Sequence, residues 1–129
     1  NLNQRFKMPS SVVEKKWIEI TNKDSLHEII EDSDKKTLLF FKHSTRCSIS
    51  SMALSRMNND FSFDLPCVNY LIDVLLYREI SNNLSEITKI THQSPQVVLL
   101  YNKKVIYSAS HGEIRPEIIS SEIKKISND

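Results

Sequence analysis

The chain has 129 residues, of which 40% are hydrophobic and 26% are charged, and its formal net charge at pH 7 is +1. This length is typical of one domain with one core, and the balanced charge gives no overall field that would attract nucleic acid or an anionic membrane surface. The single glycine, Gly112, excludes glycine-rich phosphate-binding loops, which need several glycines. The two cysteines, Cys47 and Cys67, are too few for a disulfide scaffold or a four-cysteine zinc site.

The start of the chain and its apolar runs bear on location. No run is long enough to span a membrane, and no segment has the order of basic, apolar and small residues found in a signal peptide, which favours a cytoplasmic location. The first residue is Asn1 rather than Met, so we expect that upstream residues have been removed or left out. Residues 1–16 are polar, lack periodicity and contain Met8-Pro9-Ser10-Ser11. They predict a flexible N-terminal arm that settles onto the domain near Val12 and Val13.

The next part of the chain predicts two strands, each followed by a helix. Residues 17–21 are β-branched or aromatic at most positions and predict a short strand, and Asp24 or Ser25 can cap the helix after it. Residues 37–42 form a nearly continuous apolar run, which is typical of a strand buried on both faces. Apolar residues at helical spacing mark the two helices: Leu26, Ile29 and Ile30 in the first, and Ile49, Met52, Ala53 and Met57 in the second, with Phe61 one turn beyond.

The remaining chain predicts three strands and two helices. Residues 68–73 form a strand after Pro66, and residues 96–101 and 105–109 form an antiparallel pair. Pro116 lies in the first turn of a closing helix. The apolar faces of the two helices are Ile80, Leu84, Ile87 and Ile90, and then Ile114, Ile118, Ile119, Ile123 and Ile126.

The order of elements is therefore β-α-β-α-β-α-β-β-α. Right-handed crossovers place the second strand centrally in a mixed sheet with helices on both faces, so we predict an α/β fold. The larger apolar side chains are expected in the core: Trp17, Phe40, Phe41, Met52 and Met57.

Cys47 lies just after the C-terminal end of the predicted central strand and at the start of a helix. Ligands bind at that end of open α/β sheets, and the helix dipole and unpaired backbone N–H groups there favour a thiolate. Lys42, His43 and Arg46 add local positive charge. The thiolate is the nucleophile in thiol–disulfide exchange. The alternative is a buried cysteine that packs as a small hydrophobe, but the polar neighbours of Cys47 favour a reactive thiol.

Pro95 follows Thr91-His92-Gln93-Ser94 and opens a hydrophobic strand. A bond between another residue and proline at such a position can be cis, which exposes the preceding backbone as a docking edge. The alternative is a trans proline at the start of an edge strand. Pro95 alone favours the trans form, whereas its combination with Cys47 after the second strand favours the docking edge.

These residues carry a resemblance. A strand, a Cys-x-x-Ser at a helix start, and a Ser-Pro-Gln before a β-hairpin are similar to the thioredoxin superfamily. More narrowly, Phe41 to Ser50 (FKHSTRCSIS) together with His92 to Gln96 (HQSPQ) resembles the YtxJ-type monothiol bacilliredoxins, from Trp17 to the C-terminus. The resemblance implies a thioredoxin-like domain over residues 17–129, a cis Ser94–Pro95 peptide, and Cys47 as the thiol that accepts bacillithiol from a modified protein.

The resemblance also implies the partners and the site. It implies S-thiolated proteins as substrates, bacillithiol or a similar low-molecular-weight thiol as co-substrate, and no bound cofactor. Ser48 stands where better-known members have proline, so its backbone N–H is available and should alter the basicity of the thiol. The candidate catalytic residues are Cys47 and Ser50, and the candidate substrate-binding residues are Arg46, His43, Ser94 and Pro95.

Three polar positions near Cys47 keep alternative interpretations. Ser50 occupies the place of a resolving cysteine, and its hydroxyl either hydrogen-bonds the Cys47 thiolate or is solvated in the first helical turn. Arg46 and Lys42 either clamp a carboxylate of an acidic thiol or serve solubility.

Cys67 precedes the strand that neighbours the central one, whereas Cys47 follows the central strand. If these strands are parallel, the two cysteines lie about 20 Å apart near opposite edges of the sheet. A disulfide needs Cα atoms within about 7 Å, so we expect Cys67 to be structural.

Other functions are possible in principle. A Cys47, His43 and His92 zinc site is one hypothesis, but we favour a polar or charge-bearing role for these histidines, and we expect His27 and His111 at the surface. A non-catalytic thioredoxin-like adaptor that binds a partner at the Cys47 and Pro95 edge is the other. We expect a monomer that binds neither nucleic acid nor membrane.

Overall fold

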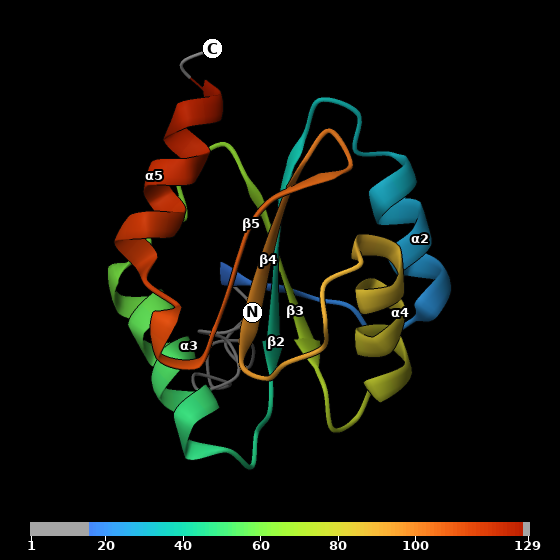
Figure 1. Ribbon diagram of the computed structural model, residues 1–129, viewed down its shortest axis with the longest axis vertical. Coiled ribbons are helices and arrows are strands. Elements are labelled where there is room, and N and C mark those ends of the chain that lie inside the picture. Colours follow the sequence, from blue (N-terminus) through green and yellow to red (C-terminus); the bar gives the residue numbers. More distant parts are fainter. Residues whose placement is uncertain (1–15, 128–129) are drawn as a thin grey trace, which may run out of the picture.

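The computed structural model describes residues 16–127 and consists of a five-stranded mixed sheet with helices on both faces (Figure 1). The strands are β1 (Ile18–Glu19), β2 (Thr37–His43), β3 (Val68–Asp73), β4 (Gln96–Tyr101) and β5 (Lys104–Ser110). The helices are α2 (Lys23–Glu31), α3 (Ser48–Asp60), α4 (Arg78–Thr88), the 3₁₀ helix η2 (His111–Glu113) and α5 (Pro116–Ser127). The predicted arm lies outside the described residues, apart from Lys16. None of the helices within residues 16–127 combines the length and apolar character needed to cross a bilayer.

The sheet has the order β1-β3-β2-β4-β5, so the predicted central position of β2 is confirmed. β2 runs parallel to β3, with Phe41 opposite Leu71, and antiparallel to β4, with Phe41 opposite Val97. The C-terminal ends of β2 and β3 therefore meet the N-terminal end of β4 at one end of the sheet. The segments that lead from β2 into α3, from β3 into α4 and from α4 into β4 all lie at this end.

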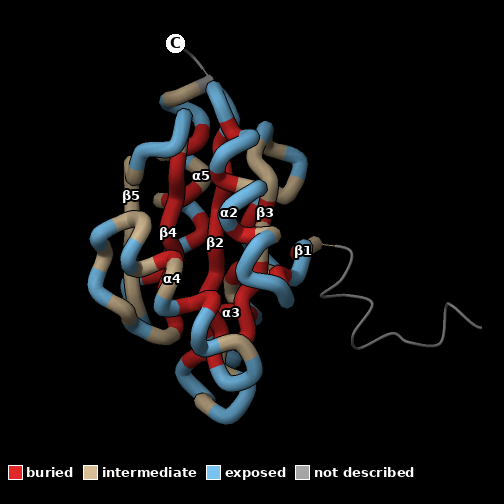
Figure 2. The backbone as a smooth tube through the Cα atoms, turned by 90° about the vertical axis from the view of Figure 1, so that its right-hand side faces the viewer, coloured by how far each residue is buried: buried red, intermediate tan, exposed pale blue. Residues whose placement is uncertain are grey.

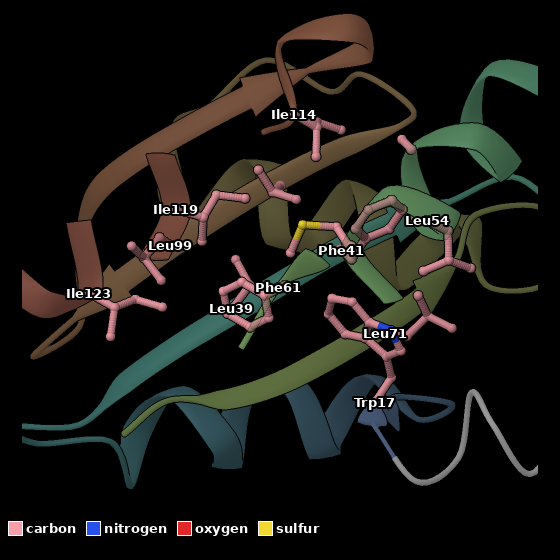
Figure 3. Packing of buried hydrophobic residues seen from close by; sticks show 13 residues of the cluster. Trp17, Leu39, Phe41, Leu54, Phe61, Leu71, Leu99, Ile114, Ile119 and Ile123 are labelled. Atoms are coloured by element: carbon pink, nitrogen blue, oxygen red, sulfur yellow. The ribbon is translucent and has the colours of Figure 1, made fainter. Parts of the chain in front are cut away.

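Every residue of β2 is buried (Figure 2). Its apolar side chains alternate between two cores. Leu39 and Phe41 pack against α3 and α5, in the core that Figure 3 shows together with Trp17. Leu38 and Phe40 pack against α2 and α4 on the other face. This burial on both faces explains the continuous apolar run, because a strand covered on one face would alternate apolar and polar residues.

Several predicted details differ from the structure. The N-cap of α2 is Asn22, not Asp24 or Ser25: its Oδ1 accepts the backbone N–H groups of those two residues, at 2.7 and 3.3 Å. Met52 is 62% exposed rather than in the core, because it lies on the outer face of α3. The inner face of α3 instead presents Ala53, Leu54 and Met57.

Three element boundaries also differ. β1 spans only Ile18–Glu19, which is shorter than predicted, whereas β5 extends over Lys104–Ser110. α4 ends at Thr88, before Ile90, because Lys89 adopts the left-handed conformation that closes a helix.

Leu39 tests the position of the core. It is fully buried on β2, so we expect Leu39→Ala to lower the free energy of unfolding by about 2–5 kcal/mol through lost apolar contact and a residual cavity. Ile18→Ala is the control: Ile18 is 53% exposed, and its change should stay within about 0.5 kcal/mol. Urea unfolding of both variants measures the difference, and equal losses would contradict the placement of Leu39.

Candidate active site

Cys47 is the N-cap residue of α3 and lies in the turn that follows β2. Its backbone N–H donates to the Ser44 carbonyl at 3.2 Å, and its carbonyl accepts the Ser51 N–H at 3.0 Å, which is the first helical bond. The N–H groups of the first helical turn therefore have no acceptor within the helix, and they form its positive end. The half-buried Cys47 side chain makes no capping bond to them. The thiol thus stands at the positive end of α3.

Ser50 stabilises this turn from the buried side of α3. Its Oγ lies 2.6 Å from His43 Nδ1 and accepts the Ser44 N–H at 2.9 Å. Ser50 is completely buried, so the expectation of a solvated residue is wrong. Within the described part of the chain no hydrogen bond joins Ser50 to Cys47. Ser50 instead joins the end of β2 to the first turn of α3, because it points inward from the helix.

His43 is the last residue of β2 and is buried beside Phe41. Burial lowers the pKa of His43, while Asp73, opposite it on β3, acts in the other direction. The His43 carbonyl also accepts the Val74 N–H at 2.9 Å. His43 is therefore an inward-facing residue that positions the Cys47 turn, rather than an exposed cation next to the thiol.

Lys42 points to the opposite face of β2 and is completely buried. Its Nζ donates to Ser85 Oγ at 2.7 Å and lies 3.2 Å from His92 Nδ1. Burial, and secondarily the Arg78 charge, lowers the pKa of Lys42 to about 8. A solubility role is excluded by the burial, and the ammonium contacts α4 and the segment before β4 instead of open space beside the thiol. Neither expectation for Lys42 was correct.

The histidines do not converge on Cys47. His92 contacts Lys42, and Lys42 precedes His43 on β2. Because consecutive side chains of a strand point to opposite faces, His43 and His92 lie on opposite faces of the sheet. No group of three His, Cys, Asp or Glu side chains in residues 16–127 is arranged to hold a metal ion. His27 and His111 are exposed, as expected.

A groove of about 470 Å³ lies beside the Cys47 turn, and Thr45, Arg46, Asp73, Leu75 and Leu76 line it. Asp73 Oδ1 accepts the N–H groups of Leu75 and Leu76, at 2.9 and 3.1 Å, and so shapes the segment after β3. Sequence reasoning missed Asp73 and the two leucines. Their signal was a Leu-Leu pair at a strand end that belongs to neither flanking periodic pattern.

Exposed apolar side chains gather at the same end of the sheet. Among the described residues, five large hydrophobic side chains are exposed, and all except Ile18 lie on the segments that flank Cys47. The four are Ile49 and Met52 on α3, and Leu75 and Leu76 after β3. Such a cluster marks a surface that contacts another molecule more often than an ordinary solvated face does.

The Ser94–Pro95 peptide is cis, as the resemblance implied. Gln96 pairs with Lys42 across β2 and β4, which puts Pro95 at the sheet end from which the Cys47 turn leaves. The Pro95 carbonyl accepts the His111 N–H at 3.0 Å. Ser94 Oγ is buried and has no hydrogen-bond partner within residues 16–127.

Comparison with known protein families matches residues 18–119 to the family described as "Monothiol bacilliredoxin BrxC". The match covers most of the chain and includes every site residue named above. The chain belongs to the monothiol bacilliredoxin family. The resemblance proposed from the Cys47 and Pro95 segments is thereby confirmed, and the protein is a thiol–disulfide oxidoreductase.

Solved structures show the fold of this bacilliredoxin. A proposed oxidoreductase with a thioredoxin fold matches at 24% identity with a TM-score of 0.71, covering 88% of this chain and 96% of that one. A thioredoxin of Malassezia sympodialis matches at 16% identity and TM-score 0.65, over 86% and 90%. The thioredoxin of Trypanosoma brucei brucei matches at 10% and 0.66, over 88% and 92%. The predicted thioredoxin-like fold is therefore confirmed.

Cys67, the second cysteine of this bacilliredoxin, lies at the other end of the sheet. It immediately precedes β3, whose first residue Val68 pairs with Leu38 near the start of β2. The predicted separation of the two cysteines is confirmed by this register, and both thiols are free. Burial raises the pKa of Cys67 to about 12, so Cys67 is a protonated, unreactive thiol at neutral pH.

The two thiols should differ in alkylation. At pH 8 only about one part in ten thousand of Cys67 is thiolate, given its pKa of about 12, so we expect iodoacetamide to modify Cys47 at least about 100-fold faster. Peptide mass spectrometry measures both rates. Raising the pH while the fold persists should accelerate the Cys67 reaction, because its thiolate population grows. Comparable rates at pH 8 would contradict the assignment.

Ser50→Ala tests the hydrogen bonds under the turn. The Ser44 N–H and the His43 ring nitrogen lose their shared partner, so we expect the free energy of unfolding to fall by about 1–3 kcal/mol. Ser51→Ala is the matched control, because Ser51 is the exposed neighbour on the same helix. Urea unfolding of the two variants side by side reports the difference. A loss no larger than that of the control would argue against the Ser50 bonds.

Proposed function

We propose that this protein removes bacillithiol, or a similar acidic low-molecular-weight thiol, from mixed disulfides on proteins, with Cys47 as the nucleophile. The observation that carries the proposal is the isolation of Cys47. Ser50 occupies the place of a resolving cysteine and is committed to His43 and Ser44, while Cys67 lies at the opposite end of the sheet. A second thiol must therefore come from outside the chain.

The proposed cycle has two exchanges. The Cys47 thiolate attacks the bacillithiol sulfur of the protein mixed disulfide, the protein sulfur leaves as a thiolate and takes a proton, and a Cys47–bacillithiol disulfide forms. The thiolate of a second bacillithiol then attacks the bacillithiol sulfur of that disulfide. Cys47 leaves as a thiolate and bacillithiol disulfide is released. Each exchange breaks one S–S bond and makes another, so the electrons balance without a bound cofactor.

The groove beside Cys47 supports the choice of co-substrate. Arg46 is exposed on its rim, and a guanidinium can bind a carboxylate of the small thiol through two hydrogen bonds. The carboxylate of Asp73 also lines the groove, but its Oδ1 already accepts two backbone N–H groups. We propose that Arg46 is the residue that recognises the anionic part of the thiol, while His43 acts on Cys47 only through the turn.

The protein part of the substrate needs a different surface. We propose that its backbone docks against Ser94 and Pro95, and that its apolar side chains contact Leu75 and Leu76. These residues lie at the same end of the sheet as Cys47, and both leucines are at least half exposed. The enzyme would act as a monomer. Its proposed location is the cytoplasm, because protein dethiolation by a free thiol needs a reducing compartment.

Replacing each cysteine separately tests the mechanism. With a protein that carries a bacillithiol mixed disulfide as substrate, we expect Cys47→Ser to lower the release rate by at least about 1,000-fold, because a hydroxyl is not a competent nucleophile here. Cys67→Ser should retain the rate within about twofold. Mass spectrometry of the intact protein should show one bacillithiol adduct on Cys47 during turnover.

Two results would overturn the proposed function. Equal loss in both variants would contradict a mechanism with one cysteine. If the wild type formed no adduct but still bound S-thiolated or reduced protein partners through the Cys47 and Pro95 edge, the protein would be an adaptor instead.

A further inference from the structure

Lys42 and His43 are consecutive residues at the end of β2, and their side chains leave the strand on opposite faces. His43 contacts Ser50 and so holds the turn that carries Cys47. Lys42 contacts α4 and the segment that leads to Pro95. The last two residues of one buried strand therefore contact both segments that a substrate must meet.

On the α4 face the contacts form a small buried network. Lys42 Nζ donates to Ser85 Oγ at 2.7 Å and lies 3.2 Å from His92 Nδ1, and Ser81 Oγ lies 3.1 Å from the same ring nitrogen. Lys42 and Ser81 are completely buried, and His92 is half-buried. His92 belongs to the irregular segment between α4 and β4 that ends in Ser94–Pro95. Its ring nitrogen thus ties that segment to β2 and α4 at once.

This network is an unusual use of a core position. Leu38 and Phe40, which face the same side of β2, are apolar. Within residues 16–127 no ion pair neutralises Lys42, and Arg78 adds a like charge. A buried cation without a carboxylate costs stability relative to an apolar side chain of similar size. A contribution to stability therefore does not explain a lysine at this position.

We propose that Lys42 and His92 are positioning residues that hold the Ser94–Pro95 segment in register with Cys47, and that protonation of His92 releases it. This inference rests on the proposed function for its consequence, since the segment held is the proposed docking edge for the substrate backbone. It assigns a role to the buried lysine that the mechanism itself does not use.

The charges around His92 give the sign of the pH effect. Lys42 on β2 and Arg78 on α4 are the charged groups that act on His92, Ser81 on α4 is neutral, and burial adds to the two positive charges in lowering the pKa of His92 below its usual 6.5. The neutral ring offers Nδ1 as an acceptor to Lys42. The protonated ring loses that acceptor and faces another cation. The contact is therefore present near neutral pH and is lost as the pH falls below about 6.5 through the lowered pKa.

Two kinds of variant separate the acceptor from the charge. His92→Leu removes the acceptor, and Lys42→Met removes the donor. His92→Asn places an amide oxygen where Nδ1 stands, so it keeps an acceptor but does not titrate. His27→Leu and Lys36→Met are the matched controls, because both positions are exposed and lie away from Cys47.

The measurement compares two reactions of Cys47. One is exchange with a protein–bacillithiol mixed disulfide, which needs the docking edge, and the other is alkylation by iodoacetamide, which does not. At pH 7.5 we expect His92→Leu and Lys42→Met to raise KM for the mixed disulfide about tenfold, with alkylation within about twofold of the wild type. His92→Asn should keep KM within about threefold, and both controls should match the wild type.

The pH dependence provides the second readout. The ratio of the exchange rate to the alkylation rate cancels the thiolate population of Cys47. We expect this ratio to fall between pH 7 and pH 5 in the wild type and to stay nearly constant in His92→Asn. An unchanged KM in His92→Leu, a parallel loss of alkylation, or the same acid limb in His92→Asn would each overturn the inference.

An activity-independent arm separates this inference from the proposed function. Nuclear magnetic resonance can follow the His92 imidazole and the backbone amides of Gln93, Ser94 and Gln96 through an acid titration. We expect those amides to shift with the His92 midpoint in the wild type and not in His92→Asn. If the wild type reduced no mixed disulfide but the amides still followed His92, the positioning role would stand and the proposed function would fail. If the amides did not follow His92, the positioning role would fail whatever the activity.

Discussion

Ser50 Oγ accepts the Ser44 N–H and pairs with His43 Nδ1 directly beneath the turn that carries Cys47. This pair of contacts fixes where α3 begins relative to the end of β2, and so where the thiol stands relative to the unpaired N–H groups of the helix. It can exist only because β2 is buried on both faces, which carries His43 into the core beside α3. The position of Cys47 therefore depends on two contacts that the thiol itself does not make.

The residues present account for the monothiol character of the site. The Ser50 hydroxyl cannot form a disulfide, and the other cysteine is separated from Cys47 by the length of β2 and β3. Burial keeps Cys67 protonated, whereas Cys47 stands at the positive end of a helix with a groove on one side. The proposed nucleophile and the buried Cys67 thus lie in different environments, which agrees with membership of the monothiol bacilliredoxin family.

The polar residues buried at this end of the sheet lower the stability of the fold, and this cost points to a role other than packing. Apolar residues would stabilise this region more if packing alone mattered. The sequence instead has Lys42 on an otherwise apolar face of β2, His92 with a lowered pKa, and Ser81 and Ser85 on α4. Natural sequences accept such local conflicts mainly at functional sites. Four exposed apolar side chains lie on the segments next to Cys47: Ile49, Met52, Leu75 and Leu76.

Local patterns in the sequence determined the order of the elements, the central place of β2 and the position of Cys47 at a helix start, because periodicity, caps and strand runs depend on near neighbours. The position of Pro95 together with Cys47 favoured a cis Ser94–Pro95 peptide, and the resemblance implied it directly. Only the tertiary structure decided the destinations of Lys42 and His43, the partners of Ser50 and the exposure of Met52, Leu75 and Leu76. Each depends on which face of the sheet or helix another element covers, and that depends on residues distant in the sequence. Lys42, for example, contacts Ser85 and His92, which lie about 40 positions away or more.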